Sequence, residues 1–179
     1  SNIAIGVEAL DANTAGNRTI AIGQTAFGAL NHTSSTNNYG VAIGHEAGRL
    51  VTTGLKNTLI GGQSGYDLTT GGQNVAVGYG ALYEATTSSN NTAVGYNALV
   101  TNTTGASNVA VGNNSLIANT TGTLNVAVGM GAMYSNLSGE RNSAIGYEAL
   151  YTNTGSYNTA NGFYAMRLNT SGAGNTAMG

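Results

Sequence analysis

The sequence predicts an all-β protein, a parallel β-solenoid or β-roll of about ten 17-residue coils, and three observations support this fold class. One unit, whose core reads Asn-x-Ala-[Val/Ile]-Gly, repeats from one end of the chain to the other. A fixed period of this length is typical of stacked repeats. Apolar residues recur at fixed positions of the unit, and the chain combines 28 glycines with no proline and 7% charged residues. The core glycines recur with this period, broken once by a longer and once by a shorter interval: Gly6, Gly23, Gly44, Gly61, Gly78, Gly95, Gly112, Gly129, Gly146, Gly162 and Gly179.

Each unit is numbered from its asparagine, so that Asn91 occupies position 1 and Gly95 position 5. Position 1 is Asn in nine of the eleven copies, and position 3 is Ala in ten, with Leu59 as the exception. Position 4 is Val, Ile or Met everywhere except at Asn161. Position 8 is Ala or Ser, position 9 is usually Leu, Met or Phe, and a polar stretch such as Asn-Thr-Thr-Gly ends the unit.

Two short strands are expected in each unit, at positions 1–4 and 6–10, bent around the glycine and returned by the Asn-Thr-Thr-Gly turn. Val, Ile, Thr and Tyr favour strands, glycine permits backbone angles that a Cβ forbids, and Asn and Gly favour turns. A helix is disfavoured, because each glycine in a helix interior costs about 1 kcal/mol relative to alanine.

Residues 1–179 are expected to form a single repeat domain, an excerpt of a longer fibre. The longer interval, between Gly23 and Gly44, places a turn insertion at about residues 28–40. The shorter interval places a one-residue deletion between Leu150 and Asn158. Both changes fall in the turn half of the unit, which agrees with strands in the other half.

Stacking places identical positions above one another at about 4.8 Å per coil, so ten coils make a rod about 50 Å long. Asparagines at position 1 can then form a ladder of side-chain amides along the rod, as in other in-register β arrays. Alanine at position 3 fits a thin roll that has no room for a larger side chain. The expected ladder residues are Asn74, Asn91, Asn108, Asn125 and Asn142.

Alternation along the strand predicts lateral association of identical chains. In Val109-Ala110-Val111 the two valines face one side and the alanine the other, so both sides are apolar. A strand that is apolar on both faces is typically buried on both. One side can be the interior of the roll, and the other needs a neighbouring chain. The expected oligomer core is the stripe at position 4: Val77, Val94, Val111, Val128 and Ile145.

The repeat resembles that of trimeric autotransporter adhesin heads, best seen at Asn142-Ser143-Ala144-Ile145-Gly146. Its fuller form, Asn-Thr-Ala-Val-Gly-Tyr-Asn-Ala-Leu followed by Asn-Thr-Thr-Gly, also resembles repeats of phage tail fibres and bacterial surface fibre proteins. The resemblance covers the whole chain. It implies a left-handed parallel β-roll, a homotrimer around one axis, and an extracellular place on a cell surface or virion.

Charge and composition argue against several other classes of protein. The net charge is −2 with five Lys and Arg residues, so the chain lacks the basic surface with which proteins neutralise nucleic-acid phosphates. No apolar run approaches the roughly 20 residues of a membrane-spanning helix, so no membrane insertion is expected of this segment. The absence of cysteine excludes a disulfide framework and thiolate metal sites.

No motif indicates catalysis, a metal or a cofactor, and the chain is expected not to be an enzyme. His32 and His45 are the only histidines, and no further ligands accompany them at metal-site spacing. The seven carboxylates are scattered over different positions of the unit. A polysaccharide-cleaving solenoid, the enzyme alternative, would need such carboxylates gathered on one sheet.

Two features could carry recognition. Tyrosines recur at positions 6 and 10, where stacked rings are expected to pack against one another, although exposed rings could also bind sugars. The insertion, with His32 and Tyr39, is a possible ligand loop, since loops on rigid scaffolds often carry function.

The sequence thus favours a structural fibre, an adhesin head or shaft that mediates attachment through a rigid trimeric rod. Its expected partners are identical chains and, at the surface it meets, a receptor or glycan. One alternative is a self-assembling extracellular filament. Another is an ice-binding β-solenoid, which would need a flat outward array of threonines.

Overall fold

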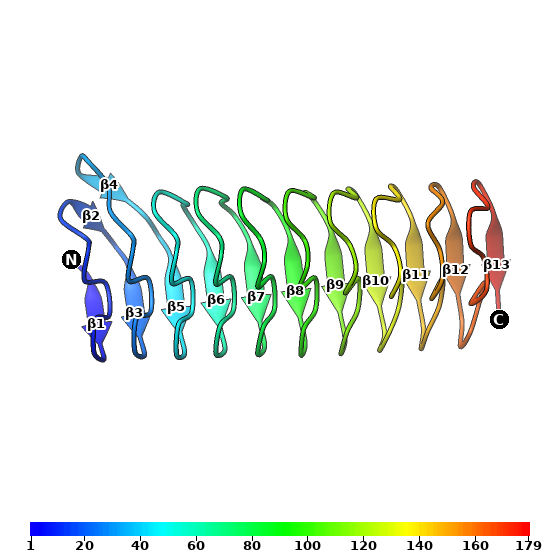
Figure 1. The fold of residues 1–179 in the computed structure, drawn as a ribbon, viewed down its shortest axis with the longest axis horizontal. Coiled ribbons are helices and arrows are strands. Elements are labelled where there is room, and N and C mark those ends of the chain that lie inside the picture. Colours follow the sequence, from blue (N-terminus) through cyan, green and yellow to red (C-terminus); the bar gives the residue numbers. More distant parts are fainter.

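The structure is a computed structural model that describes all residues 1–179, and it shows a parallel β-solenoid without helices. Eleven three-residue strands lie side by side in one sheet, in chain order along the rod (Figure 1). The predicted all-β parallel solenoid of about ten regularly spaced coils is therefore confirmed. The chain therefore contains no helix that could span a membrane. The strands are β1 (Ile3–Ile5), β3 (Ile20–Ile22), β5 (Val41–Ile43), β6 (Thr58–Ile60), β7 (Val75–Val77), β8 (Thr92–Val94), β9 (Val109–Val111), β10 (Val126–Val128), β11 (Ser143–Ile145), β12 (Thr159–Asn161) and β13 (Thr176–Met178).

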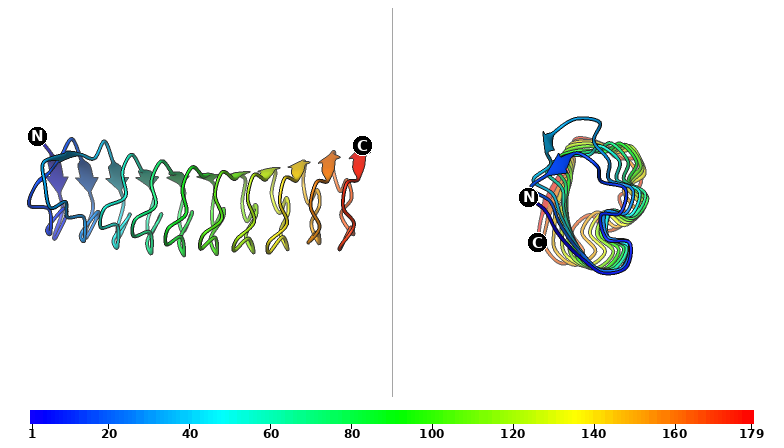
Figure 2. Two further views of the ribbon diagram at one scale, coloured as in Figure 1. Left: turned by 90° about the horizontal axis from the view of Figure 1, so that it is seen from above. Right: turned by 90° about the vertical axis from the view of Figure 1, so that its left-hand side faces the viewer.

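Every strand occupies positions 2–4 of its unit and pairs with the equivalent residues of the next coil. Ala76, Ala93 and Ala110 are aligned across β7, β8 and β9. Backbone hydrogen bonds run to both neighbours, as when Thr92 donates to the Asn108 carbonyl oxygen and Gly95 to that of Val77, each at 2.8 Å. The rod is therefore one continuous ladder, and its outline along the axis is a closed, indented loop (Figure 2).

The position-5 glycine is required by two features at once. Gly95 has a φ of 136°, in the region that side chains disfavour. A Cβ at this point would also lie 2.6 Å from the carbonyl oxygen of Gly112 in the next coil. The bend and the close stacking of coils both explain why this position is glycine in every unit.

The second predicted strand, at positions 6–10, is wrong. In the coil of Asn91 this segment is a turn, because Asn97 and Leu99 have φ of 51° and 53° and alternate with residues of ordinary φ. The segment still bonds from coil to coil, as when Leu99 donates to the Ser115 carbonyl at 3.1 Å. These bonds and the complete burial of Leu99 offset a conformation that costs roughly 1–2 kcal/mol per residue.

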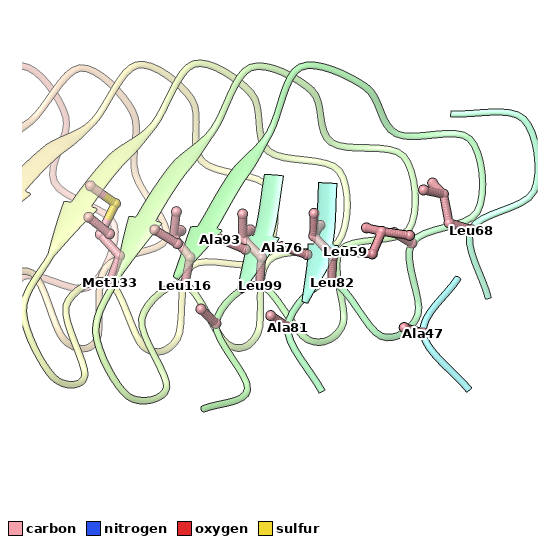
Figure 3. Packing of buried hydrophobic residues seen from close by; sticks show 14 of the residues in the cluster. Ala47, Leu59, Leu68, Ala76, Ala81, Leu82, Ala93, Leu99, Leu116 and Met133 are labelled. Carbon is pink, nitrogen blue, oxygen red and sulfur yellow. The ribbon is translucent and has the colours of Figure 1, made fainter. Parts of the chain in front are cut away.

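The core is a thin column of small and medium side chains inside the loop of each coil (Figure 3). Ala93 at position 3 and Ala98 and Leu99 at positions 8 and 9 are completely buried. Position 12 also points inward, and its chemistry changes along the rod. It is apolar in four coils of the first half, and it is asparagine in the following coils. The completely buried residues at this position are Leu30, Val51, Leu68, Ala85, Asn102, Asn119, Asn136 and Asn153.

Leu59, the one large residue at position 3, fits because two coils lack a side chain at position 9. A Cβ at Gly48 would lie 2.7 Å from Leu59 Cδ1, and one at Gly65 would lie 2.9 Å from Leu59 Cδ2. The leucine thus fills the volume that position 9 supplies elsewhere. The expectation that the roll has no room for a larger side chain at position 3 is valid only where position 9 carries a side chain.

Replacing Leu59 with alanine is expected to lower the free energy of unfolding by about 2–5 kcal/mol, because it leaves a cavity between two glycines. Adding Gly65→Leu should restore a large part of this loss, since that position already has a φ of 59°, like the leucines of other coils. Urea denaturation of both variants tests this. Gly65→Leu alone should destabilise the protein, because its side chain collides with Leu59, and a neutral result would contradict the compensation.

The insertion forms a loop that projects from the rod near the N-terminal end (Figures 1 and 2). Its strand β4 (Thr36–Asn37) pairs in parallel with β2 (Gly16–Asn17) of the preceding coil. Asn38 is completely buried and donates from Nδ2 to the Gly54 carbonyl oxygen at 2.9 Å. In this coil position 1 is Gly40, and a Cβ there would collide with Asn38 Oδ1. The loop thus supplies an asparagine where the regular unit lacks one.

Candidate functional site

The outer face of the eleven-stranded sheet carries the side chains of positions 2 and 4. In β9 and β10 the central alanine is buried and the flanking valines are partly exposed. Of the predicted oligomer core, Val77, Val94, Val111 and Val128 are partly exposed and Ile145 is 44% exposed. The structure places all five in one row on this face, in consecutive strands. None of them contributes to the closed interior.

No charged residue lies on this face. Sixteen of its twenty-two positions are Val, Ile or Met, and the others are Thr or Ser apart from one asparagine. The threonines are scattered and give no continuous hydroxyl row. The polar positions are Thr58, Thr92, Ser143, Thr159, Asn161 and Thr176.

The size of the face is in the range of a protein–protein interface. Eleven strands at about 4.8 Å and three residues at about 3.3 Å give a surface of about 50 by 10 Å, or about 500 Å². Patches of roughly 300–600 Å² are the largest on typical monomers and are often functional. Two such faces together bury about 1,000 Å², the lower bound of a specific interface.

Behind the sheet, the five predicted ladder asparagines are completely or almost completely buried and joined by their amides. Nδ2 of Asn108 donates to Oδ1 of Asn91 at 3.3 Å and to the Gly122 carbonyl at 2.8 Å. Oδ1 of Asn108 accepts from the backbone and side chain of Asn125 at 3.0 and 3.2 Å. The same series includes Asn74 and Asn142. These residues stiffen the rod from inside and lie out of reach of a ligand.

A second amide ladder, at position 12, was missed by sequence reasoning. Nδ2 of Asn119 donates to Asn102 Oδ1 at 2.7 Å, and that of Asn136 to Asn119 Oδ1 at 3.1 Å. The series is interrupted after Asn136, whose Oδ1 is buried without a partner. The next coil is the one shortened by a residue. Its Asn153 donates to the Gly155 carbonyl oxygen of its own coil and accepts from Asn169 Nδ2 at 2.8 Å, so the series resumes there. The recurring asparagine of the Asn-Thr-Thr-Gly stretch could have indicated this second ladder, but asparagine is equally typical of a turn.

The two residues of the possible ligand loop do not come together. His32 is 5% exposed, and its Nε2 lies 3.3 Å from Asn38 Nδ2. Tyr39 is 52% exposed, and its ring lies under the Arg18 guanidinium, which donates to the tyrosine hydroxyl. His32 is therefore part of the interior, whereas Tyr39 belongs to the outer surface.

Acid is expected to loosen this loop. Burial lowers the pKa of His32 below its ordinary value of about 6.5. The fold favours the neutral imidazole. The contribution of His32 to the stability of the fold is therefore complete above pH 6.5 and is lost as the pH falls through the lowered pKa. A protonated Nε2 would also point an N–H at the Asn38 amide donor. The neighbours Gly16 and Asn38 carry no charge that could compensate.

Amide hydrogen exchange of Asn38, whose N–H donates to the Asn17 carbonyl oxygen at 2.9 Å, tests this expectation. Protection relative to the intrinsic rate should fall below pH 6.5 in the natural chain and stay constant in His32→Gln, which cannot be charged. His45→Gln, at an exposed position, is the matched control and should keep the pH dependence. An identical profile in His32→Gln would contradict the role of His32.

The tyrosines stack from coil to coil, as the packing interpretation expects. The rings of Tyr66 and Tyr83 lie 5.0 Å apart at position 10, and those of Tyr79 and Tyr96 lie 5.9 Å apart at position 6. Each ring thus turns a face toward its neighbour. A sugar that stacks on aromatic rings would have to compete with these contacts.

The carboxylates are dispersed along the rod and several are paired. Glu46 contacts Arg49 at 3.5 Å and accepts from Gln63 Nε2 at 3.0 Å. Glu148 pairs with Arg167. No group of three or more His, Cys, Asp or Glu side chains lies close enough to hold a metal ion. The outer sheet face is therefore the most extensive candidate site.

Comparisons of the chain with protein-family models, curated proteins and solved structures found no match. What the outer sheet face can do is therefore inferred from its own geometry and chemistry.

Proposed function

We propose that the chain is a non-enzymatic structural fibre, the head or shaft of an adhesin or viral fibre on a cell surface or virion. The observation that carries this proposal is the uncharged, mostly aliphatic sheet face that runs along the whole rod. Such a face is costly to leave in water, at roughly 25 cal/mol for each Å² of apolar surface. Association that covers it would join single thin rods into one stiffer fibre.

An identical chain is the partner that suits this face best. Strands on a second copy repeat at the same spacing, so its rows of side chains match the rows of the first along the entire length. The face carries no charge, so copies approach without repulsion. The resemblance to adhesin heads and tail fibres favours three copies around one axis and left-handed coils.

The proposed mechanism is mechanical. A rod held by two internal amide ladders and a shared apolar core resists bending and can project contact sites from a surface. Three copies with ten repeats each offer many equivalent weak sites, and their contributions add by multivalency. The binding partner would be a receptor or glycan on the opposing surface, met by turns and loops on the outside of the rod.

Mass measurement in solution tests the proposal. Sedimentation equilibrium of the purified protein at micromolar concentration should give three times the 17.9 kDa mass of one chain. A monomer at all concentrations would contradict the shared core. A dimer would retain the covered face and overturn the threefold arrangement.

A further inference from the structure

Repetition creates a problem for a fibre made of identical chains. All eleven strands have the same length and spacing, and most of the outward side chains along the face are similar aliphatic residues. A copy displaced by one coil would still pack ten of its eleven strands against its neighbour. An antiparallel copy would also meet an aliphatic face. Burial of apolar area alone therefore does not select the direction of the copies, and it favours their alignment only by one strand of overlap.

One residue breaks the uniformity of the row at position 4. Asn161 is the only polar residue at position 4, and it lies between Ile145 and Met178 in the adjacent strands. Its side chain is exposed on the outer face, while its backbone carbonyl accepts from Gly179 at 2.8 Å. An amide with donors and an acceptor is thus held at one level of an otherwise apolar row.

We propose that Asn161 sets the parallel direction and the axial alignment of the associated chains. This inference rests on the proposed function, because it requires copies that share the outer face. In parallel, aligned copies, the Asn161 side chains lie at one level and can hydrogen-bond to one another. A shift of one coil places each amide against Ile145 or Met178, and an antiparallel arrangement places it against Ile22.

The difference between these arrangements is a buried amide with or without a partner. A polar group buried without a hydrogen bond is strongly disfavoured. A single buried asparagine fixes alignment and partner number in coiled coils by this effect, at some loss of stability. In copies shifted by one coil, the cost of the misplaced amide adds to the loss of a single strand of overlap. The polar residues Ser143, Thr159 and Thr176 lie near the same end, which adds to the asymmetry of the face.

Spin labelling can measure the alignment, because the chain has no cysteine of its own. A label on Thr53→Cys, at an exposed turn, reports the distance between equivalent points of neighbouring copies. Parallel, aligned chains give one narrow distance distribution. Shifted chains offset the labels along the axis by about 4.8 Å per coil, and because this offset combines with their lateral separation as the sides of a right triangle, it lengthens and broadens the distribution. Antiparallel chains add much longer distances.

The test variant is Asn161→Val, which gives this strand the residue type of the other strands and so keeps the fold. We expect the oligomer to persist by mass, while the ratio of displaced to aligned pairs rises at least about tenfold. Asn113→Val, which removes an exposed asparagine outside the sheet face, is the matched control and should leave a single distance. Val111→Asn combined with Asn161→Val moves the polar level to another strand and should restore a single distance.

Each outcome decides one of the two proposals. If the natural chain is a monomer, the proposed function fails, and this inference fails with it. If the natural chain associates and Asn161→Val keeps its single narrow distance, only the role of Asn161 is overturned. A monomeric Asn161→Val chain would also overturn it, because the amide would then hold the copies together instead of aligning them.

Discussion

Replacing Asn108 with alanine is expected to lower the free energy of unfolding by about 3–5 kcal/mol, more than typical single substitutions. The side chain is completely buried and takes part in four hydrogen bonds. Its loss removes the acceptor of two N–H donors of Asn125. The Gly122 carbonyl keeps only its bond from Asn119 at 3.1 Å, and Oδ1 of Asn91 keeps one from the Asn108 backbone at 2.9 Å. The expected loss in the free energy of unfolding is therefore smaller than the sum for four independent hydrogen bonds.

Chemical denaturation followed by circular dichroism measures this effect. Asn108→Asp separates hydrogen bonding from volume, because it keeps the shape but turns an acceptor toward Asn91 Oδ1 and the Gly122 carbonyl. It should also destabilise the fold strongly at pH 7. Asn113→Ala, at an exposed position, is the control and should change stability by less than about 0.5 kcal/mol. Equal effects of Asn108→Ala and Asn113→Ala would contradict the role of the ladder.

The parts of this structure that follow from the repeat could be predicted from the sequence. Once units stack in register, every residue meets its own equivalent, so the side chains of Asn91 and Asn108 must be neighbours. The alternation in Val109-Ala110-Val111 likewise predicts that alanine faces one side and the valines the other. These predictions depend only on period and on strand geometry.

The path of the chain through positions 6–10 could not be predicted, because local preference opposes it. Leucine rarely adopts a positive φ, yet Leu99, Leu116 and Leu150 all do so. The coil-to-coil hydrogen bonds and the burial of the leucine decide the conformation, and both exist only after stacking. The sequence of a single unit therefore does not reveal these hydrogen bonds or this burial.

Two exceptions to the repeat were also beyond sequence reasoning, since each is compensated by a residue at a different position of the unit. Leu59 at position 3 is matched by glycine at position 9, in its own unit at Gly65 and in the preceding unit at Gly48. Asn38 takes the place of the side chain missing at Gly40. The outer face differs from these cases. The alternation places its residues outside, but the chain that would cover them is not part of the fold.

Replacing Val111 with aspartate is expected to abolish association while the coil itself stays folded. Val111 lies on the outer face in the middle of the sheet, so the introduced carboxylate projects away from the core. In the proposed trimer three such carboxylates would meet at one level, away from water, with no cation on the face to pair with them. The dissociation constant should rise at least about a hundredfold.

Thr104→Asp is the matched control, since it adds the same charge at an exposed turn position of the rod. Sedimentation should give a monomer for Val111→Asp and an oligomer for Thr104→Asp, with the same circular dichroism spectrum for both. Acidification toward pH 4, near the pKa of an ordinary aspartate, should restore part of the association of Val111→Asp. Because the neutral acid removes only the charge, such recovery would assign the loss to electrostatics at the shared face and not to misfolding. An oligomer of Val111→Asp at pH 7 would show that the copies associate through another surface.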